Sequence, residues 1–427
     1  MTRSAWRRTR IADLVASGDA EVKTGPFGTQ LHASDYVESG TPVINVRNIG
    51  FGGIRADKLE YIADETVRRL SGHVLQPGDI VFGRKGAVER HVLIRDRQSK
   101  WFQGSDCLRL RLRTKRVLPQ FLSYYLLTRD HQTWMMQQCS HGATMASLNQ
   151  DIVGRIEFAA PDPGGQQVIA SILSAYDDLI ENNTRRIAIL EEMARRIYEE
   201  WFVRFRFPGH EGVRMVESEL GLVPEGWRAA ALGDVAAYIN RGLAPKYDDN
   251  AACVVINQKC IRDQRLSLGE ARKQGKPVPP EKVVRLGDVL INSTGVGTLG
   301  RVAQVLQAIH NCTVDTHVSI VRPGKDCDPD FFGLTLLAQQ AHFEAQGVGS
   351  TGQTELSRGR IAETSIVVPP LALQQAFAAL VGPMRRLTVT LENKNLNLRT
   401  TRDLLLPKLI SGEVDVSALP EPEALAA

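Results

Sequence analysis

The chain has 427 residues, which is longer than one domain usually is, so we expect two domains and connecting elements. Its 52 Lys and Arg residues against 48 Asp and Glu residues give a formal charge of +4, too small to indicate a nucleic-acid partner from composition alone. No window approaches the roughly 18 uncharged apolar residues of a membrane span, and the basic stretch Met1 to Arg10 precedes no apolar signal segment. We therefore expect a cytoplasmic protein without a membrane partner.

The cysteines and histidines do not form a metal-binding pattern. Six cysteines occur without any CxxC pair, and nine histidines occur without HExxH or HxH spacing. This predicts buried, reduced thiols and no metal site.

Short β-like runs between Gly and Pro turns dominate both halves of the chain. In chain order they are Val43–Val46, Asp79–Phe82, Val92–Ile94, Cys253–Asn257, Val289–Asn292 and His317–Val321. An apolar helix is expected at Phe121–Leu127, and a linker from Phe207 to Trp227 separates the halves.

An internal repeat appears when the chain is compared with itself at a shift of about 208 residues. The segment LQPGDIVFGRKG, which contains Gly78 and Asp79, aligns with RLGDVLINSTG, which contains Gly287 and Asp288. Further along the same alignment, residues Leu148, Pro161, Gln166 and Gln167 meet Leu356, Pro369, Gln374 and Gln375. Because the landmarks keep one order and nearly one spacing, we interpret the chain as a tandem repeat.

Each half ends in a long helical pattern with apolar residues at coiled-coil spacing. The first seam is Leu173, Tyr176, Ile180, Asn183, Ile187, Leu190, Ala194, Ile197 and Trp201. The second is Phe377, Leu380, Met384, Leu387, Leu391, Leu398 and Leu405, with Lys394 and Thr401 as polar interruptions. We expect the two helices to pair, and Asn183 either fixes their register or is a tolerated polar residue.

Motifs for catalysis were sought and not found. The segment Gly295-Val-Gly297-Thr-Leu-Gly300 matches the dinucleotide fingerprint in letters, but the following residues alternate like a strand, which favours a hairpin loop. There is no GxxxxGK[ST] motif, no Asn-Pro-Pro-aromatic element and no evident carboxylate cluster for metal-dependent cleavage. The sequence thus predicts no catalytic residues.

Polar loops at matching places in the two halves are suited to DNA recognition, because Arg and Lys bind guanine or phosphate and Asn and Gln pair with adenine. The candidates in the first half are Lys23, Thr29, Gln30, Arg47, Asn48, Arg84, Lys85, Arg90, His91, His141, Thr144 and Ser147. Those in the second half are Arg241, Lys246, Tyr247, Asn257, Gln258, Lys259, Ser293, Thr294, Thr298, Arg301, Ser350, Thr351, Gln353 and Thr354. For any one residue the alternative is an ordinary solvated loop, and only the symmetric placement of the set favours binding.

Three segments carry a resemblance to a known family. They are Lys23-Thr-Gly-Pro-Phe-Gly-Thr-Gln-Leu31 with Ser34-Asp-Tyr36 and Gly40-Thr-Pro-Val-Ile44, then Leu220-Gly-Leu-Val-Pro-Glu-Gly-Trp227, then Arg402-Asp-Leu-Leu-Leu-Pro-Lys-Leu-Ile-Ser-Gly-Glu-Val-Asp415. In this order, over essentially the whole chain, they resemble the specificity subunits of Type I restriction-modification systems. The second half departs from the pattern, since Arg241-Gly-Leu-Ala-Pro-Lys-Tyr247 replaces the Gly-Pro-Phe-Gly form and leaves its base contacts undefined.

The resemblance implies a non-catalytic subunit of a phage-defence complex that recognises a bipartite, asymmetric site in double-stranded DNA. Its partners would be two methyltransferase (modification) subunits and two motor-nuclease (restriction) subunits. The chain itself would bind no cofactor, and S-adenosylmethionine, ATP and Mg²⁺ would bind the partner subunits, which carry adenine-N6 methylation and ATP-dependent cleavage. Helix length would set the gap between the half-sites, so that one turn inserted or deleted within Ala188–Arg196 changes the gap.

The expected fold class is α+β. Two mostly β target recognition domains form a pseudo-twofold tandem repeat, each followed by a long helix, and the helices pair as an antiparallel coiled coil. The expected bounds are 1–160 for the first recognition domain, 161–207 for the first helix, 208–370 for the linker and second recognition domain, 371–416 for the second helix, and 417–427 for a flexible tail.

Two other functions remain open from the sequence. One is a single-chain bifunctional restriction enzyme and methyltransferase, which methyl transfer by the purified chain would support. The other is a coiled-coil protein-interaction scaffold, for which a DNA-binding test with the methyltransferase partner should show no sequence preference and little salt dependence.

Overall fold

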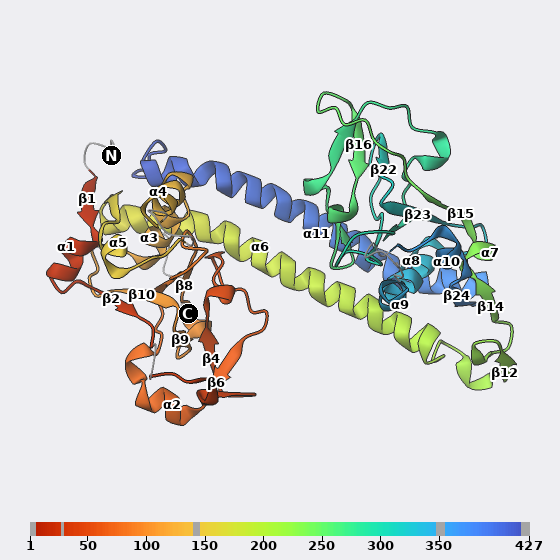
Figure 1. Cartoon of the computed structure of the whole chain (residues 1–427), viewed down its shortest axis with the longest axis horizontal. Helices are drawn as coiled ribbons and strands as arrows, with labels where there is room; N and C mark the ends of the chain where they lie inside the picture. Colours follow the sequence, from red (N-terminus) through yellow and green to blue (C-terminus); the bar gives the residue numbers. More distant parts are fainter. Residues whose placement is uncertain (1–5, 27–29, 140–145, 347–354, 420–427) are drawn as a thin grey trace. The chain divides into compact units, whose positions relative to one another are not determined.

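The structure is a computed structural model, which describes residues 6–26, 30–139, 146–346 and 355–419. The chain divides into two compact units, residues 1–181 with 396–427 and residues 182–395. Two long helices, α6 (Pro163–Tyr198) and α11 (Leu371–Ser411), each contribute one part to each unit (Figure 1). Each unit is therefore a β-rich domain and a section of both helices.

The domain of the first unit is built on two sheets. The larger has the order β2-β10-β7-β8-β5, and the smaller has the order β3-β6-β4-β9. Their bounds are β2 Ala20–Thr24, β10 Cys107–Leu112, β7 Ile80–Gly83, β8 His91–Leu93, β5 Phe51–Gly52, β3 Tyr36–Val37, β6 Glu60–Ile62, β4 Thr41–Ile44 and β9 Phe102–Gln103. A separate ribbon pairs β1 (Arg7–Arg10) with β11 (Glu157–Ala160).

Short helices cover the larger sheet of this first domain, and the core lies between them and the sheet. They are α1 Ile11–Ala16, α3 Pro119–Leu126, α4 Arg129–Cys139 and α5 Gln150–Gly154, while α2 Asp64–Arg69 packs on the smaller sheet. The apolar helix expected at Phe121–Leu127 is confirmed as α3, in which Phe121 and Leu122 are fully buried. The same core includes Leu406 and Leu409 from the far end of the chain.

The domain of the second unit repeats this plan, which confirms the tandem repeat. Its sheets have the orders β15-β23-β20-β21 and β19-β16-β22. The bounds are β14 Arg228–Ala231, β15 Ala236–Arg241, β16 Cys253–Ile256, β17 Ile261–Arg262, β18 Arg265–Leu266, β19 Arg272–Gln274, β20 Val289–Asn292, β21 Val302–Gln304, β22 Cys312–Val314, β23 Val318–Pro323, β24 Ser365–Val368, α7 Leu232–Val235, α8 Pro329–Ala338, α9 Gln340–Ala345 and α10 Arg358–Glu363. Strand β16 pairs in parallel with β22 and antiparallel with β19, as β4 does with β9 and β6.

The Gly-Asp pair of the repeat has a structural cause that is the same in both domains. Gly78 and Gly287 both have φ +89°, a conformation that favours glycine. The aspartates that follow are almost completely buried, and each binds an arginine through two hydrogen bonds of 2.7–2.8 Å, Asp79 with Arg111 and Asp288 with Arg322. A buried carboxylate is tolerated only with such a partner, so this turn keeps the pair in both copies.

The glutamines of the repeat attach each long helix to its own domain. The Gln166 side chain accepts a hydrogen bond from the Leu118 N–H and donates to the carbonyls of Arg116 and Pro161. Gln374 repeats this pattern with the Asp328 N–H and the carbonyls of Asp326 and Pro369. Because both amides are fully buried and satisfied, each fixes the start of its helix against the loop before α3 or α8.

The two helices pair antiparallel in each unit. In the first unit Arg402 of α11 binds Asp177 of α6 at 2.6 Å, and in the second unit Phe377 packs on Trp201. None of the residues predicted for the first seam is exposed. Asn183 lies in that seam and donates to the Asn395 side chain at 2.9 Å, and Asn395 in turn donates to the Thr184 hydroxyl. This matched polar pair across the helices supports the register-fixing interpretation of Asn183.

The seam of α11 differs in phase from the sequence prediction. Leu380 and Leu387 are 45% and 36% exposed, and Val381 and Thr388 are buried in their place. The residues that face the partner helix or its domain are Phe377, Val381, Met384, Thr388, Leu391, Asn395, Leu398, Arg402, Leu405 and Leu409, which keep the three-four spacing without a break. Lys394 and Thr401 are exposed and lie outside this seam, in which Asn395 and Arg402 have polar partners on α6.

The connection from α6 to the second domain contains an ordered hairpin, β12 (Met215–Ser218) with β13 (Gly221–Pro224). Helix α6 ends in a π-helical turn at Glu199–Val203, and an aromatic cluster follows in which Phe202 contacts Trp227, Phe331 and Phe377 with ring centroids 4.8–5.8 Å apart. In the first domain the residue that corresponds to Trp227 is Trp6, which packs on Phe121 and on Gly412. Both domains thus begin with a tryptophan that contacts the end of a long helix.

A buried histidine in the first domain predicts acid sensitivity. His91 is 1% exposed and bonds the Ser123 hydroxyl at 2.8 Å, and burial, with a smaller contribution from His131, lowers its pKa from 6.5 to about 3. Because the unfolded chain binds the proton more tightly, stability falls as the pH drops below 6.5, by about 2 kcal/mol at pH 5. His91→Gln should flatten the fall in thermal unfolding temperature between pH 7.5 and pH 5, whereas His310→Gln, at an exposed position, should not. An unchanged pH profile in His91→Gln would contradict this assignment.

Candidate nucleic-acid interface

The polar residues of the first domain gather at the end of the buried central strand β7. The Arg84 N–H donates to the Asp106 carbonyl, and the Arg84 carbonyl accepts from the Leu148 N–H, both at 2.8 Å. Lys85 forms an isolated bridge with Ser147, and its ammonium lies 3.5 Å from the Asp106 carboxylate. Strand β7 therefore delivers Arg84 and Lys85 to the surface beside the chain that leads into α5.

The Gly-Pro-Phe-Gly motif starts at the same place. The Gly25 N–H donates to the Cys107 carbonyl, and a Cβ at Gly25 would lie 2.0 Å from the Gly104 carbonyl oxygen. No other residue fits so close to a backbone, which explains the glycine. The loop is thereby held against β10, next to Asp106.

The second domain builds the same arrangement with different side chains. The Ser293 carbonyl accepts from the Leu356 N–H, as Arg84 does from Leu148, and Thr294 forms a bridge with Glu355. The Thr294 hydroxyl lies 2.6 Å from His317 Nδ1. Arg241 bonds the Glu355 carboxylate at 2.7 Å, and a Cβ at Gly242 would lie 1.8 Å from the Val314 carbonyl oxygen.

The two sites thus have the same backbone arrangement and differ in the side chains that it presents. Arg84 and Lys85 of the first domain occupy the places of Ser293 and Thr294 in the second. Guanidinium and ammonium groups donate only, whereas the threonine hydroxyl both donates and accepts. Two surfaces of this kind suit two different ligands of the same class.

The Gly295–Gly300 segment is confirmed as a hairpin loop between β20 and β21. A Cβ at Gly295 would meet the Thr298 hydroxyl and the Gln258 amide within 2.4 Å. Arg301 donates to the Gly297 carbonyl at 2.8 Å. Gln258, Thr298 and Arg301 therefore lie together at the rim of the second site.

Three candidate residues have structural roles instead of surface positions. Asn48, His91 and Ser293 are at most 1% exposed. The Asn48 side chain bonds the Asn45 N–H and the carbonyls of Arg55 and Asp57, and the Ser293 hydroxyl bonds Ser319. Since their polar atoms face inward, these three side chains are not placed to contact DNA. They stabilise the fold of their domains instead.

The other candidates in the first domain have varied surroundings. Lys23 donates to the Gly72 carbonyl, Arg47 pairs with Glu60, and Arg90 pairs with Glu89 and lies 5.2 Å from the Phe51 ring centroid. The side chain of Gln30 is exposed. Thr29, His141, Thr144, Ser350, Thr351, Gln353 and Thr354 lie outside the described residues.

In the second domain Asn257 caps the turn at Lys259 and bonds the Glu270 carbonyl, while Lys246 and Lys259 are exposed. The structure adds cations that the sequence analysis missed. Lys276 and Lys282 donate to the carbonyls of Ala244 and Gly242 at 2.7 Å, and Arg272 stacks on Tyr247. These contacts join segments some 30 to 40 residues apart, so no local pattern pointed to them.

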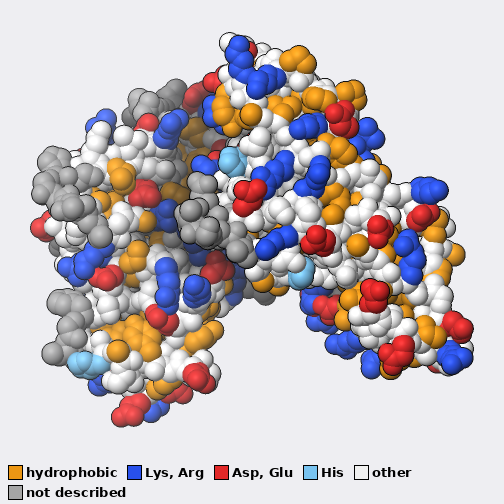
Figure 2. Space-filling model, turned by 45° about the vertical axis from the view of Figure 1, so that its right-hand side comes forward, with side chains coloured by type: hydrophobic (Ala, Val, Ile, Leu, Met, Phe, Trp, Pro, Cys, Tyr) orange, Lys and Arg blue, Asp and Glu red, His pale blue; other side chains and the backbone are white. Residues whose placement is uncertain are grey.

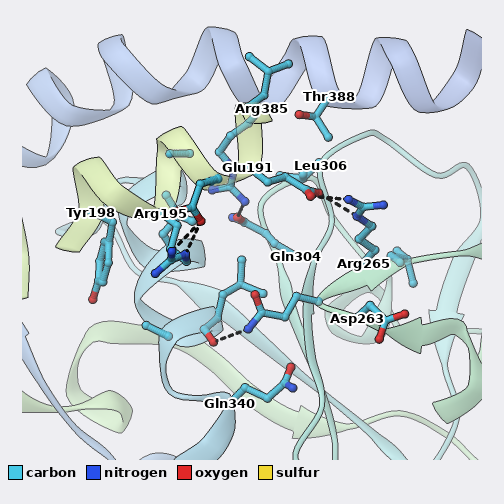
Figure 3. Close-up of a pocket in the computed structure, with 18 of the residues that line it drawn as sticks. Glu191, Arg195, Tyr198, Asp263, Arg265, Gln304, Leu306, Gln340, Arg385 and Thr388 are labelled. Atoms are coloured by element: carbon cyan, nitrogen blue, oxygen red, sulfur yellow. Dashed lines mark hydrogen bonds and ion pairs between the residues drawn. The ribbon is translucent and has the colours of Figure 1, made fainter. Parts of the chain in front are cut away.

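Each domain is also tied to the helices of its own unit by arginines. Arg95 and Arg97 bind Asp178 and Glu181 of α6 in the first unit. In the second, Arg265 points from β18 to Glu191 of α6, at the edge of a cavity of about 900 Å³ between the domain and both helices (Figure 3). The arginines that line the cavity all pair with carboxylates of the same unit, so their charges are neutralised inside the protein. They are Arg195, Arg204, Arg265 and Arg385.

Lys and Arg side chains are interspersed with carboxylates on the face seen in Figure 2. Among the described residues, no group of His, Cys, Asp and Glu side chains is placed to hold a metal ion. No described helix is long and apolar enough to cross a membrane. All six cysteines are buried and free of disulfides, as expected.

Comparison with known proteins identifies the repeated unit. The family model for the Type I restriction modification DNA specificity domain matches residues 33–192 and again residues 224–399. The chain belongs to this family. The two matches coincide with the two copies of the repeat, each running from a recognition domain into its helix.

The relatives and one solved structure agree with this membership. The MjaIX specificity subunit of Methanocaldococcus jannaschii is 27% identical over 313 residues, with 71% of each chain covered. The HindI specificity subunit of Haemophilus influenzae is 21% identical, with 87% of this chain and 94% of the relative covered. The S subunit from M. genitalium shares the fold with a TM-score of 0.61 at 16% identity, covering 95% of this chain and 96% of that one.

Proposed function

We propose that this Type I specificity subunit recognises a bipartite, asymmetric site in double-stranded DNA, with one half read by each domain. The observation that carries the proposal is the pair of matching sites, in which one backbone arrangement presents Arg84 and Lys85 in the first domain and Thr294 with His317 in the second. Arg and Lys are suited to guanine acceptors, whereas a hydroxyl can pair with either kind of base edge. Different side chains on one scaffold predict two different half-sites.

The candidate contacts are the surface members of the two sites. They are Lys23, Gln30, Arg47, Arg84, Lys85, Arg90 and Ser147 in the first domain, and Arg241, Lys246, Tyr247, Asn257, Gln258, Lys259, Thr294, Thr298 and Arg301 in the second. We assign residues 1–160 to the first recognition domain, 208–370 to the linker and second recognition domain, 161–207 and 371–416 to the spacer helices, and 417–427 to the tail. The subunit acts in the cytoplasm and performs no chemistry of its own.

The helices are the proposed docking surface for two methyltransferase subunits and, in the complete complex, two motor-nuclease subunits. Large apolar side chains that the helix pair does not bury support this. Leu380 and Leu387 on α11 and Ile189 and Met193 on α6 are 36–54% exposed. Apolar side chains at helical spacing on an outer face fit helices of a partner, as in a bundle. S-adenosylmethionine, ATP and Mg²⁺ belong to those partners.

The half-sites should be separable by mutation. Replacing Arg84 and Lys85 together by Ala should relax one half of the methylated motif, by roughly 10-fold in discrimination at a base that loses a bidentate contact. Thr294→Val should relax only the other half. The measurement is methylome sequencing of cells that carry the whole system, with Lys325→Ala as the control, since Lys325 lies beyond the opposite end of β23. Relaxation of both halves by either variant would contradict the proposal.

The helix pair should set the gap between the half-sites. Glu191 of the segment Ala188–Arg196 and Glu392 of α11 both contact Arg265 of the second domain, and Glu181 contacts Arg97 of the first. The deletion is therefore better placed at 182–188 together with 394–400, which leaves these three glutamates in the chain. Removing seven residues from each helix keeps the seam in phase and shortens the pair by about 10 Å. The methylated motif should keep both halves and lose about three base pairs of gap. A deletion from α6 alone, which breaks the pairing, is the control and should abolish methylation.

The outer leucines should be needed for assembly. Leu380→Glu with Leu387→Glu should lower co-purification with the methyltransferase at least about tenfold, because it places charge in an apolar contact. Leu220→Glu, at a leucine of the β12–β13 hairpin with 45% exposure, is the matched control. Circular dichroism should show unchanged helix content in all variants. Full co-purification of the double variant would rule out this docking face.

A further inference from the structure

The inserts that carry the smaller sheets differ sharply in charge. Residues 25–79 of the first domain hold five Lys and Arg against seven Asp and Glu, whereas residues 242–288 of the second hold nine against six. The two inserts have the same place in the repeat, between the first strand and the central strand of the larger sheet. The excess of positive charge in the second copy is therefore not a requirement of the fold.

Two of these cations are held in place by the loop at the second site. The Lys282 ammonium donates to the Gly242 carbonyl and the Lys276 ammonium to the Ala244 carbonyl, both at 2.7 Å. An ammonium has three N–H donors, so each lysine is positioned by one bond and retains two donors for another ligand. The two accepting residues, Gly242 and Ala244, are two positions apart in the loop. Leu243 between them forms a β-bridge with Asp315 of the core.

Two further cations adjoin this pair. The Arg272 guanidinium lies over the Tyr247 ring, 3.5 Å from its centroid, and the Arg272 side chain remains exposed. The Lys246 carbonyl accepts a hydrogen bond from the N–H of Gly275, the residue before Lys276, and the Lys246 side chain is exposed. Together Lys246, Arg272, Lys276 and Lys282 are termed here the loop cations. The nearby acids are Asp248, Asp249 and Glu281, and none lies within 4 Å of a loop cation as an ion pair among the described residues.

The described residues of the first domain contain no such group. Its loop at Gly25 is flanked instead by Lys23 and Arg109, both of which donate to the Gly72 carbonyl. Arg109 is 1% exposed and pairs with Glu21. The two cations beside the first loop therefore bond within their own domain, whereas the loop cations of the second copy have no ion pair among the described residues.

We infer that the loop cations of the second domain bind the phosphate backbone of DNA, and that this domain supplies a sequence-independent grip that the first domain lacks. The inference rests on the proposed function, since it assigns a second role to the same surface. Lysine is suited to this role because a point charge on a flexible stem binds phosphate without reading bases. The grip also accounts for the departure of Arg241–Tyr247 from the Gly-Pro-Phe-Gly form, because Ala244 and Lys246 belong to it.

The test measures the salt dependence of DNA binding by the complex of this chain with its methyltransferase subunits. Lys276→Gln with Lys282→Gln should make the plot of log affinity against log salt less steep by about two units. Affinity should fall by the same factor, about tenfold or more, for the methylated target and for unrelated DNA. Lys276→Arg with Lys282→Arg keeps the charges and should restore the slope, and Lys325→Gln is the control for charge alone.

The outcomes separate the two proposals. If the unaltered complex methylates no defined motif, the proposed function fails whatever the slope. If it methylates a bipartite motif but the double Gln variant keeps the original slope, the inference fails while the function stands. A double variant that changes the methylated sequence itself would also overturn the inference, because the lysines would then be base readers.

Discussion

The antiparallel pairing of α6 and α11 is the contact on which both units depend. Each domain is built on a section of both helices, so the first unit joins two ranges that are far apart in sequence, residues 1–181 and 396–427, while the second encloses the middle of the chain, residues 182–395. The polar bond between Asn183 and Asn395 restricts this pairing to one register, because a shift of one turn would leave two amides facing apolar side chains. The seam thus contributes specificity of alignment, while the apolar residues around it contribute most of the free energy of association.

Repetition explains why the two domains are equivalent in scaffold and different in surface. The Asp79–Arg111 and Asp288–Arg322 pairs, together with the Gln166 and Gln374 amides, are buried in both copies and fix the same turns. Residues at the strand ends carry no such constraint, so the same place holds arginine and lysine in one copy and serine and threonine in the other. A binding protein of this design changes its ligand without changing its core.

Much of the architecture could be predicted from the sequence because it depends on local or repeated patterns. The Gly-Asp turns, the apolar helix at Phe121 and the two long helices all follow from such patterns. The phase of the second seam could not, since hydrophobic periodicity counts Leu380 and Leu387 as core. It cannot show that Thr388 is buried or that Asn395 bonds Asn183 on the other helix. The burial of Asn48, His91 and Ser293 could not be predicted either. The sequence pattern of a loop-like segment is the same whether its polar residue faces water or a neighbouring carbonyl. Lys276 and Lys282 were missed since their carbonyl partners lie far away in sequence.

The contact of the chain's end with its beginning has a consequence for synthesis. The core that surrounds Phe121 in the first domain includes Leu406, Leu409 and Ile410, and Trp6 packs against Gly412. The ribosome makes the N-terminal domain first, but the side chains that close its core emerge almost last. During translation this domain therefore exposes apolar surface until α11 has been made. A product truncated before α11 keeps that surface exposed.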